Sequence, residues 1–302
     1  MTASGRTFAI FVAAVVGFPL MVAPMSAQGP ASTVTGAFTL SGQALKPAHA
    51  AAFRVRNQNA PRTLETFVML TLKPVDIGAI SAEIDPYMAA INDPAAMRAD
   101  YLAFWVSDSG ETRVNAHVGG TQYIDTSGFI MGSKGSLVAS CKENTPSRIA
   151  CTVKTAEAVK SLDGPSWTLD VTFASAVSSR AAGKPLPVDG GPAAKALVAL
   201  ITAVGGNALA PILAGLTPDE AKSYQETYRT PAENLESAKD ILSVRLPKKP
   251  KVTGGEQIAS DHVVLEVEGE PYPGGRMLYL VQMKLIDGRW RYDRSNPVGL
   301  LR

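Results

Sequence analysis

The chain has 302 residues, with 29 lysines and arginines against 27 aspartates and glutamates. This near balance gives no electrostatic basis for binding nucleic acid or an anionic membrane. Hydrophobic residues make up 46% of the sequence and charged residues 19%, a composition that indicates a globular rather than a disordered protein. On length alone, one or two domains are expected.

Residues 1–27 predict a secretory signal peptide. Arg6 is the only charged residue before Lys46, an apolar stretch covers residues 7–23, and Ser26 and Ala27 follow it. A positive start, an apolar run and a small-residue end are the three parts of such a signal. The run is shorter than the ~20 residues of a spanning helix. We therefore expect cleavage after Ala27 and a periplasmic or secreted bacterial protein, the alternative being an uncleaved anchor.

No second membrane segment is expected once the signal is removed. The most apolar later stretch, residues 193–216, is interrupted by Gly205, Gly206 and Pro211. No cysteine lies near the end of the signal, so the thiol that anchors bacterial lipoproteins is missing.

Cys141 and Cys151 are the only cysteines of the chain. They flank a turn-like segment, residues 143–147, with apolar, strand-like residues on either side. In an oxidising compartment, two cysteines at this spacing predict a disulfide that joins the arms of a hairpin. The alternative is a pair of buried free thiols.

Residues 33–180 predict a mainly-β domain, a sandwich or a barrel. Short runs of alternating or β-branched residues recur along this part of the chain at a spacing typical of such folds. A helical spacing of apolar residues interrupts them between Ile84 and Arg98. Strands are expected at residues 34–40, 50–56, 66–72, 101–106, 113–118, 129–131, 136–140, 149–154 and 167–177.

Residues 181–192 are dense in glycine and proline and predict a linker. Residues 193–302 then predict an α+β domain, so the expected fold class is α+β overall. Helices are expected at residues 193–214, with a break near Gly205, from Thr217-Pro218 onward, and at residues 232–242. Strands are expected at residues 251–258, 262–268, 277–286 and 290–292, the last two joined by the hairpin signal Asp287-Gly288.

The order of helices and then strands, with the terminal Asp287-Gly288-Arg289-Trp290 hairpin, resembles the cone-shaped NTF2-like domains of secreted bacterial proteins. The whole layout is similar to that of uncharacterised exported bacterial proteins with a β domain, a Gly/Pro linker and such a C-terminal domain. The resemblance implies a fold and leaves the function open.

Motifs for catalysis or metal binding are missing from the sequence. His49, His117 and His262 lie far apart and have no second ligand at metal-binding spacing, so no metal and no cofactor are expected. Residues 132–136, the nearest approach to an anion-binding loop, are interpreted as a hairpin turn, and residues 248–251 as a solvated basic loop.

A row of carboxylates, Glu266, Glu268 and Glu270, alternates along one predicted strand. Val263, Leu265 and Val267 occupy the opposite face and should point into the core. An acidic face of this kind is typically solvated, and Lys284, Arg289 and Arg291 on neighbouring strands are its expected partners. The alternatives are an acid/base pair or a Ca²⁺ site.

The leading hypothesis is a non-enzymatic periplasmic protein that binds a protein partner or a small apolar ligand. A ligand would lie between the first helix and the sheet of the C-terminal domain, unless side chains fill that space. The residues expected to line this pocket are Leu197, Val198, Ile201, Tyr279, Val281 and Met283.

Two other classes remain open. The first is an NTF2-like enzyme, an isomerase, dehydratase or hydrolase, with Asp261, His262 and Tyr279 as candidate catalytic residues. The predicted strand register points His262 outward, which counts against this class. The second is a structural protein of the cell envelope.

Overall fold

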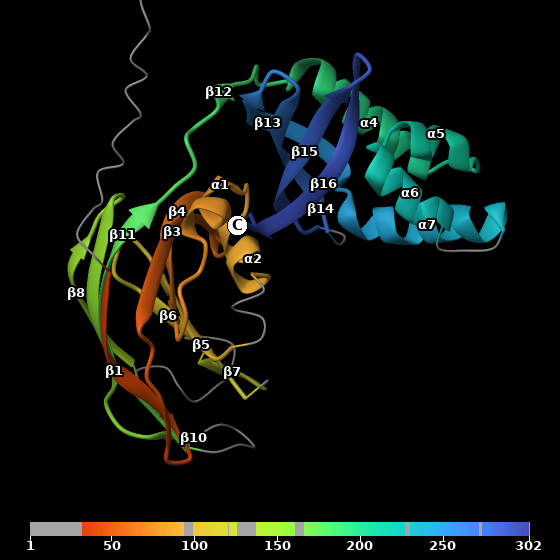
Figure 1. The fold of residues 1–302 in the computed structure, drawn as a ribbon. Helices are drawn as coiled ribbons and strands as arrows, with labels where there is room; N and C mark the ends of the chain where they lie inside the picture. The colour runs from red at the N-terminus through yellow and green to blue at the C-terminus, as the bar shows by residue number, and fades with distance from the viewer. Residues whose placement is uncertain are drawn as a thin grey trace, which may run out of the picture.

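The computed structural model describes residues 32–93, 99–119, 121–125, 137–160, 166–226, 230–271 and 274–301. The fold is mixed α and β, with a large curled sheet and a separate, smaller antiparallel sheet (Figure 1). None of the helices in these residues has the length and apolarity needed to cross a membrane. Three expected features lie outside the described residues: the signal peptide of residues 1–27, the strand at residues 129–131 and the turn at residues 132–136.

The larger sheet curls because β11 belongs to both of its halves. β11 pairs antiparallel with β1 and β9, and its last residues pair parallel with β3 at Val177 and Ser178. The strand order is β2-β1-β11-β3-β4-β5-β6-β7, with β9 and β10 also on β11 and β8 on β9. The strands are β1 (Thr33–Leu40), β2 (Gln43–Leu45), β3 (His49–Asn57), β4 (Ala60–Thr71), β5 (Tyr101–Val106), β6 (Thr112–Val118), β7 (Thr121–Asp125), β8 (Leu137–Asn144), β9 (Arg148–Thr155), β10 (Val159–Lys160) and β11 (Ser166–Ser178).

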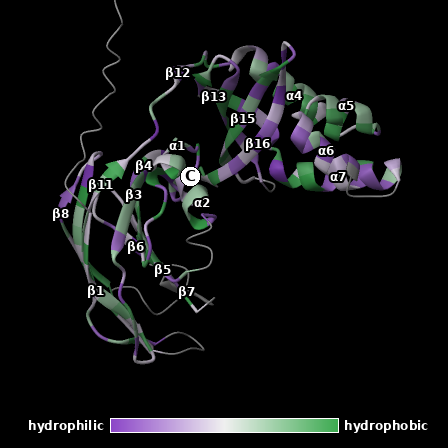
Figure 2. Ribbon diagram, viewed as in Figure 1, coloured by the Kyte–Doolittle hydropathy of each residue, from purple (hydrophilic) through white to green (hydrophobic). Residues whose placement is uncertain are grey.

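Strand alternation places one core inside the curl. Along β11, Leu169, Val171 and Phe173 are buried whereas the residues between them are exposed. Figure 2 shows hydrophobic and hydrophilic residues alternating along the strands. The ring of Phe173 lies 5.3 Å from that of Phe104 on β5, so the two halves of the sheet pack against each other.

The outer face of β3, β4 and β5 carries a second apolar cluster, which two short helices cover. Phe53, Phe67 and Met69 lie on this face and pack with residues of α1 (Ile77–Ala82) and α2 (Pro86–Ile91). The helical spacing predicted from residue 84 corresponds to α2, whereas α1 lies before the predicted range and was missed; residues 94–98 lie outside the described residues. The boundary between the two helices follows from capping, because Asp85 accepts a hydrogen bond from the backbone N–H of Met88 and so begins α2.

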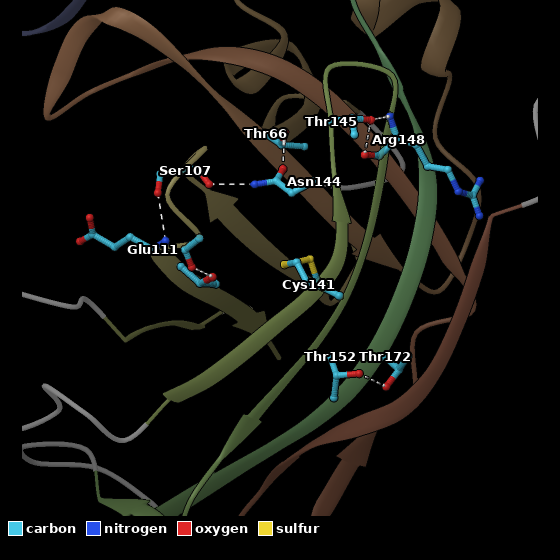
Figure 3. Close-up of a disulfide and its surroundings, with 12 residues drawn as sticks. Thr66, Ser107, Glu111, Cys141, Asn144, Thr145, Arg148, Thr152 and Thr172 are labelled. Atoms are coloured by element: carbon cyan, nitrogen blue, oxygen red, sulfur yellow. Dashed lines mark hydrogen bonds between the residues drawn. A yellow bond between two sulfur atoms is a disulfide. The ribbon is translucent and has the colours of Figure 1, made fainter.

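The predicted disulfide is confirmed. Cys141 on β8 and Cys151 on β9 face each other across an antiparallel hairpin, with an S–S distance of 2.01 Å (Figure 3). The turn closes through Thr145, whose backbone N–H donates to the carbonyl of Arg148. Beside it, the Asn144 side chain donates to the carbonyl of Ser107 and ties the hairpin to the end of β5.

The smaller sheet is covered by four helices on one face. Its strand order is β12-β13-β14-β15-β16, all antiparallel. Leu197 and Leu242 of the helices pack on Leu265, Val281 and Tyr292 of the strands. The elements are β12 (Lys184–Pro185), α4 (Gly191–Val204), α5 (Leu209–Ala214), α6 (Pro218–Glu226), α7 (Pro231–Arg245), β13 (Lys248–Ala259), β14 (His262–Glu270), β15 (Met277–Ile286) and β16 (Arg289–Leu300).

Local signals account for most of these boundaries. α6 begins at Pro218 and the α4–α5 break includes Gly205, both as predicted. Asp287 and Gly288 take the left-handed conformation, with φ of 51° and 72°, as a tight hairpin requires. Residues 248–251, predicted to form a basic loop, are instead the start of β13, because their backbone pairs with β14. Within the predicted linker, Lys184 and Pro185 pair with β13 as well.

Candidate binding cleft

A cleft of about 490 Å³ lies between the larger sheet and the smaller one. This volume falls within the range of small-molecule sites, about 300–1,000 Å³. Segments far apart in the sequence meet there, from β3 to β16. The lining residues are Arg54, Val55, Arg56, Gln58, Leu64, Glu83, Ile84, Asp85, Pro86, Tyr87, Trp105, Ser179, Arg180, Ala182, Gly183, Pro185, Gly255, Glu256, Val264, Glu266, Leu280, Pro297 and Val298.

One wall of the cleft is the face of the smaller sheet that the helices leave free. Val263, Leu265 and Val267 of β14 pack toward the helices, as predicted. Val264 and Glu266 alternate with them and line the cleft instead. We call this second surface, which also carries Glu268, Leu278 and Leu280, the cleft face.

The cleft face corrects the prediction of a solvated acidic row. Glu268 is only 6% exposed, and Glu266 is about one quarter exposed at its side chain. Figure 1 shows the reason: the larger sheet, with α1 and α2, lies beside this face near the end of β16. The strand pattern alone could not reveal that a second sheet covers it.

The partners of the acidic row also differ from those expected. Glu266 pairs with Arg56 of β3, and Glu268 pairs with Arg62 of β4 as well as Arg276. The hydrogen bond from Arg276 is the main reason that the pKa of Glu268 lies below its ordinary value. Lys284, one of the expected partners, instead bonds Asp293 at 3.0 Å. The ion pairs of Glu266 and Glu268 therefore join the two sheets.

The remaining predicted ion pairs, between Glu270 and the cations Arg289 and Arg291, are also not formed. Glu270 bonds Lys249 at 2.8 Å. Arg289 is exposed at the start of β16, and the buried Nε of Arg291 has no hydrogen-bond partner among the described residues. Neither arginine is among the described ion-pair partners of the acidic row.

The opposite wall is aromatic. Tyr87 of α2 and Trp105 of β5 both line the cleft, with ring centroids 5.3 Å apart in an edge-on arrangement. Phe67 packs against both rings, also with centroid distances of 5.3 Å. The guanidinium of Arg113 lies 5.4 Å from the Trp105 ring and pairs with the buried Glu65. Burial raises the pKa of Tyr87, so its hydroxyl is a neutral hydrogen-bonding group.

The pocket predicted from the sequence lies on the other face of the smaller sheet. Leu197, Tyr279, Val281 and Met283 are buried together there in the core under the helices, and Ile201 packs against them. Val198 is 46% exposed on the outer side of α4 and does not join them. Leu197, Val281 and Met283 have no exposed surface, an arrangement expected of side chains that fill the space. An open pocket there stays a prediction.

The candidate catalytic residues do not converge. Tyr279 faces the helices, whereas His262 alternates with Val263 and lies on the side of the cleft face. His262 is partly buried rather than fully outward, and burial lowers its pKa. Asp261 is exposed in the turn before β14, where its carbonyl accepts from Leu285. None of these three side chains lines the cleft.

The described residues contain no group of three or more His, Cys, Asp or Glu side chains that could hold a metal ion. His49, His117 and His262 lie on different strands, and His117 stacks on Tyr101 at 5.2 Å.

Sequence reasoning missed Asp85, Tyr87 and Trp105 as site residues. The capping signal Asp85-Pro86 was visible in the sequence, but it says nothing about which distant strand the helix meets. No known protein family matches the chain, and no curated protein shows significant similarity to it.

Proposed function

We propose that this chain is an exported, non-enzymatic binding protein that holds a small, largely apolar ligand in the cleft. The observation that carries the proposal is the cleft itself, about 490 Å³ with an aromatic wall of Tyr87 and Trp105 and an apolar wall of Val264 and Leu280. Ligand sites in proteins typically combine such apolar walls with a few polar groups.

Export to the periplasm or medium of a bacterium is part of the proposal. It is supported by the signal-like pattern of residues 1–27 and by the Cys141–Cys151 disulfide, which persists in oxidising compartments. We also propose two domains joined through residues 181–192, the second of them NTF2-like. The separate cores inside the larger curl and beneath α4 to α7 support this division.

Binding is favoured over catalysis by an NTF2-like cone. That enzyme class would need His262 and Tyr279 beside one cavity, and strand alternation puts the two side chains on opposite faces of the sheet. A structural role in the envelope would not require a cleft of ligand size with a partly polar lining.

The test is a titration with N-phenyl-1-naphthylamine, a neutral apolar dye that fluoresces when it leaves water. Leu64 lines the cleft and is 43% exposed, so Leu64→Trp should fill the cleft with little effect on folding. Leu72 is equally exposed and does not line the cleft, which makes Leu72→Trp the matched control. We expect saturable dye binding by the wild type and the control, and much weaker binding by Leu64→Trp. No saturable binding by the wild type, or equal binding by both variants, would contradict the proposal.

A further inference from the structure

The charged groups that line the cleft are paired almost completely. The three arginines each have a carboxylate partner: Arg54 bonds Asp108 at 3.1 Å, Arg56 pairs with Glu266, and Arg180 pairs with Glu256. Glu83 bonds Arg294 at 2.8 Å. One lining carboxylate, that of Asp85, bonds no cation among the described residues.

Neutral donors hold the Asp85 carboxylate in place. Its Oδ1 atom accepts from the backbone N–H of Met88 at 3.1 Å, and its Oδ2 atom accepts from the side-chain amide of Asn296 at 3.3 Å. Met88 belongs to α2 and Asn296 to β16, so both walls of the cleft fix the position of this group. The cation that acts on it, Arg294, is bonded to Glu83 and has the weakest influence on its pKa.

The surroundings of Asp85 suit a cationic group. Tyr87 is two residues away, and its ring packs against that of Trp105. Aromatic faces attract ammonium groups, and a partly buried carboxylate without a cation gains most from one. Each of the three lining arginines already has a carboxylate partner, whereas Asp85 bonds no cation among the described residues, so the cleft favours one additional positive charge.

We propose that the ligand is an amine with an apolar or aromatic body, bound with its ammonium group at Asp85 and its body between the aromatic wall and the cleft face. This inference rests on the proposed function and names the class of ligand. Burial raises the pKa of Asp85, and an ammonium group bound beside it should lower that pKa again by favouring the ionised form.

Three probes that differ only in their head group test the inference: 4-phenylbutylamine, 4-phenylbutanol and 4-phenylbutanoate. Each displaces the naphthylamine dye from the full chain in a competition titration. We expect the amine to bind about 10- to 100-fold more tightly than the alcohol, the effect of one charge-assisted hydrogen bond. The carboxylate should bind most weakly.

The decisive variant is Asp85→Asn. Asparagine caps helices as well as aspartate does, so the start of α2 is kept while the charge is removed. Asp85→Asn should lose the preference for the amine over the alcohol and still bind the dye. The matched control is Asp76→Asn at the N-cap of α1, which makes the same change outside the cleft and should keep the preference.

The outcomes separate the two proposals. Dye binding without a preference for the amine, or a preference that survives Asp85→Asn, overturns the amine inference and leaves the binding function standing. Failure of the wild type to bind the dye overturns the binding function itself. Loss of dye binding by Asp85→Asn with its circular dichroism unchanged would also overturn the inference, because the carboxylate would then serve the shape of the cleft.

Discussion

Replacing Glu268 by glutamine tests the ion pairs that join the two sheets. The carboxylate is 6% exposed and bonds both Arg62 of β4 and Arg276, which precedes β15. The side chains of the two arginines are 54% and 60% exposed. The substitution removes the charge but keeps the shape, and it leaves the arginines in contact with solvent.

The exposure of the arginines sets the expected magnitude. Breaking a fully buried ion pair costs about 3–5 kcal/mol, because the remaining charge stays buried without a partner. An exposed pair contributes about 0–1 kcal/mol. Here the carboxylate is buried but Arg62 and Arg276 can recover their hydration, so we expect Glu268→Gln to lower the free energy of unfolding by about 1–2 kcal/mol.

Urea unfolding followed by tryptophan fluorescence measures this change. The matched control is Glu270→Gln on the same strand, whose partner Lys249 is 77% exposed, and it should cost less than about 0.5 kcal/mol. A double-mutant cycle with Arg62→Gln isolates the contact between the sheets, and we expect a coupling energy of about 0.5–1 kcal/mol. Equal costs for the two glutamine variants, or a coupling energy of zero, would refute the reasoning.

Three further predictions concern pH, the disulfide and the N-terminus. Because the folded-state pKa of Glu268 is lowered, the stability it provides is present above its unfolded pKa and is lost as the pH falls through the folded one. Glu268→Gln should therefore flatten the loss of stability below about pH 4.3, the ordinary value for glutamate, as measured by thermal unfolding across pH. Replacing Cys141 and Cys151 by serine should cost about 2–3 kcal/mol, and thiol labelling of the denatured, unreduced wild type should detect no free cysteine. Mass analysis of the secreted protein should show a chain that begins after Ala27, whereas an intact Met1 would refute the signal.

The periodic elements were predictable because their signals are local. The alternation of Leu169, Val171 and Phe173 defines both the strand and its buried face. Asp287-Gly288 gives a hairpin because few other residue pairs accept two successive positive φ angles. The cysteine pairing followed from the short turn between two strand-like runs.

The cleft was not predictable because it depends on contacts between residues far apart in the sequence. Arg56 and Glu266 are separated by 210 positions, and each has the pattern of an ordinary solvated strand residue. Only the packing of one sheet against another brings them together. The same holds for Asp85, whose local role as a helix cap hides its position opposite Asn296.

The smaller sheet is covered on both faces, which affects how a fragment containing only this sheet and its helices would behave. A fragment that starts at α4 would uncover Val264, Leu278 and Leu280, which are at most 9% exposed in the whole chain. Such a fragment would expose an apolar sheet face that can associate with the same face of another copy, so it is expected to dimerise or precipitate. Gel filtration of the fragment with Leu278 and Leu280 changed to serine would show whether solubility returns. Dimerisation or precipitation of the unmodified fragment would then result from the uncovered sheet face rather than from misfolding.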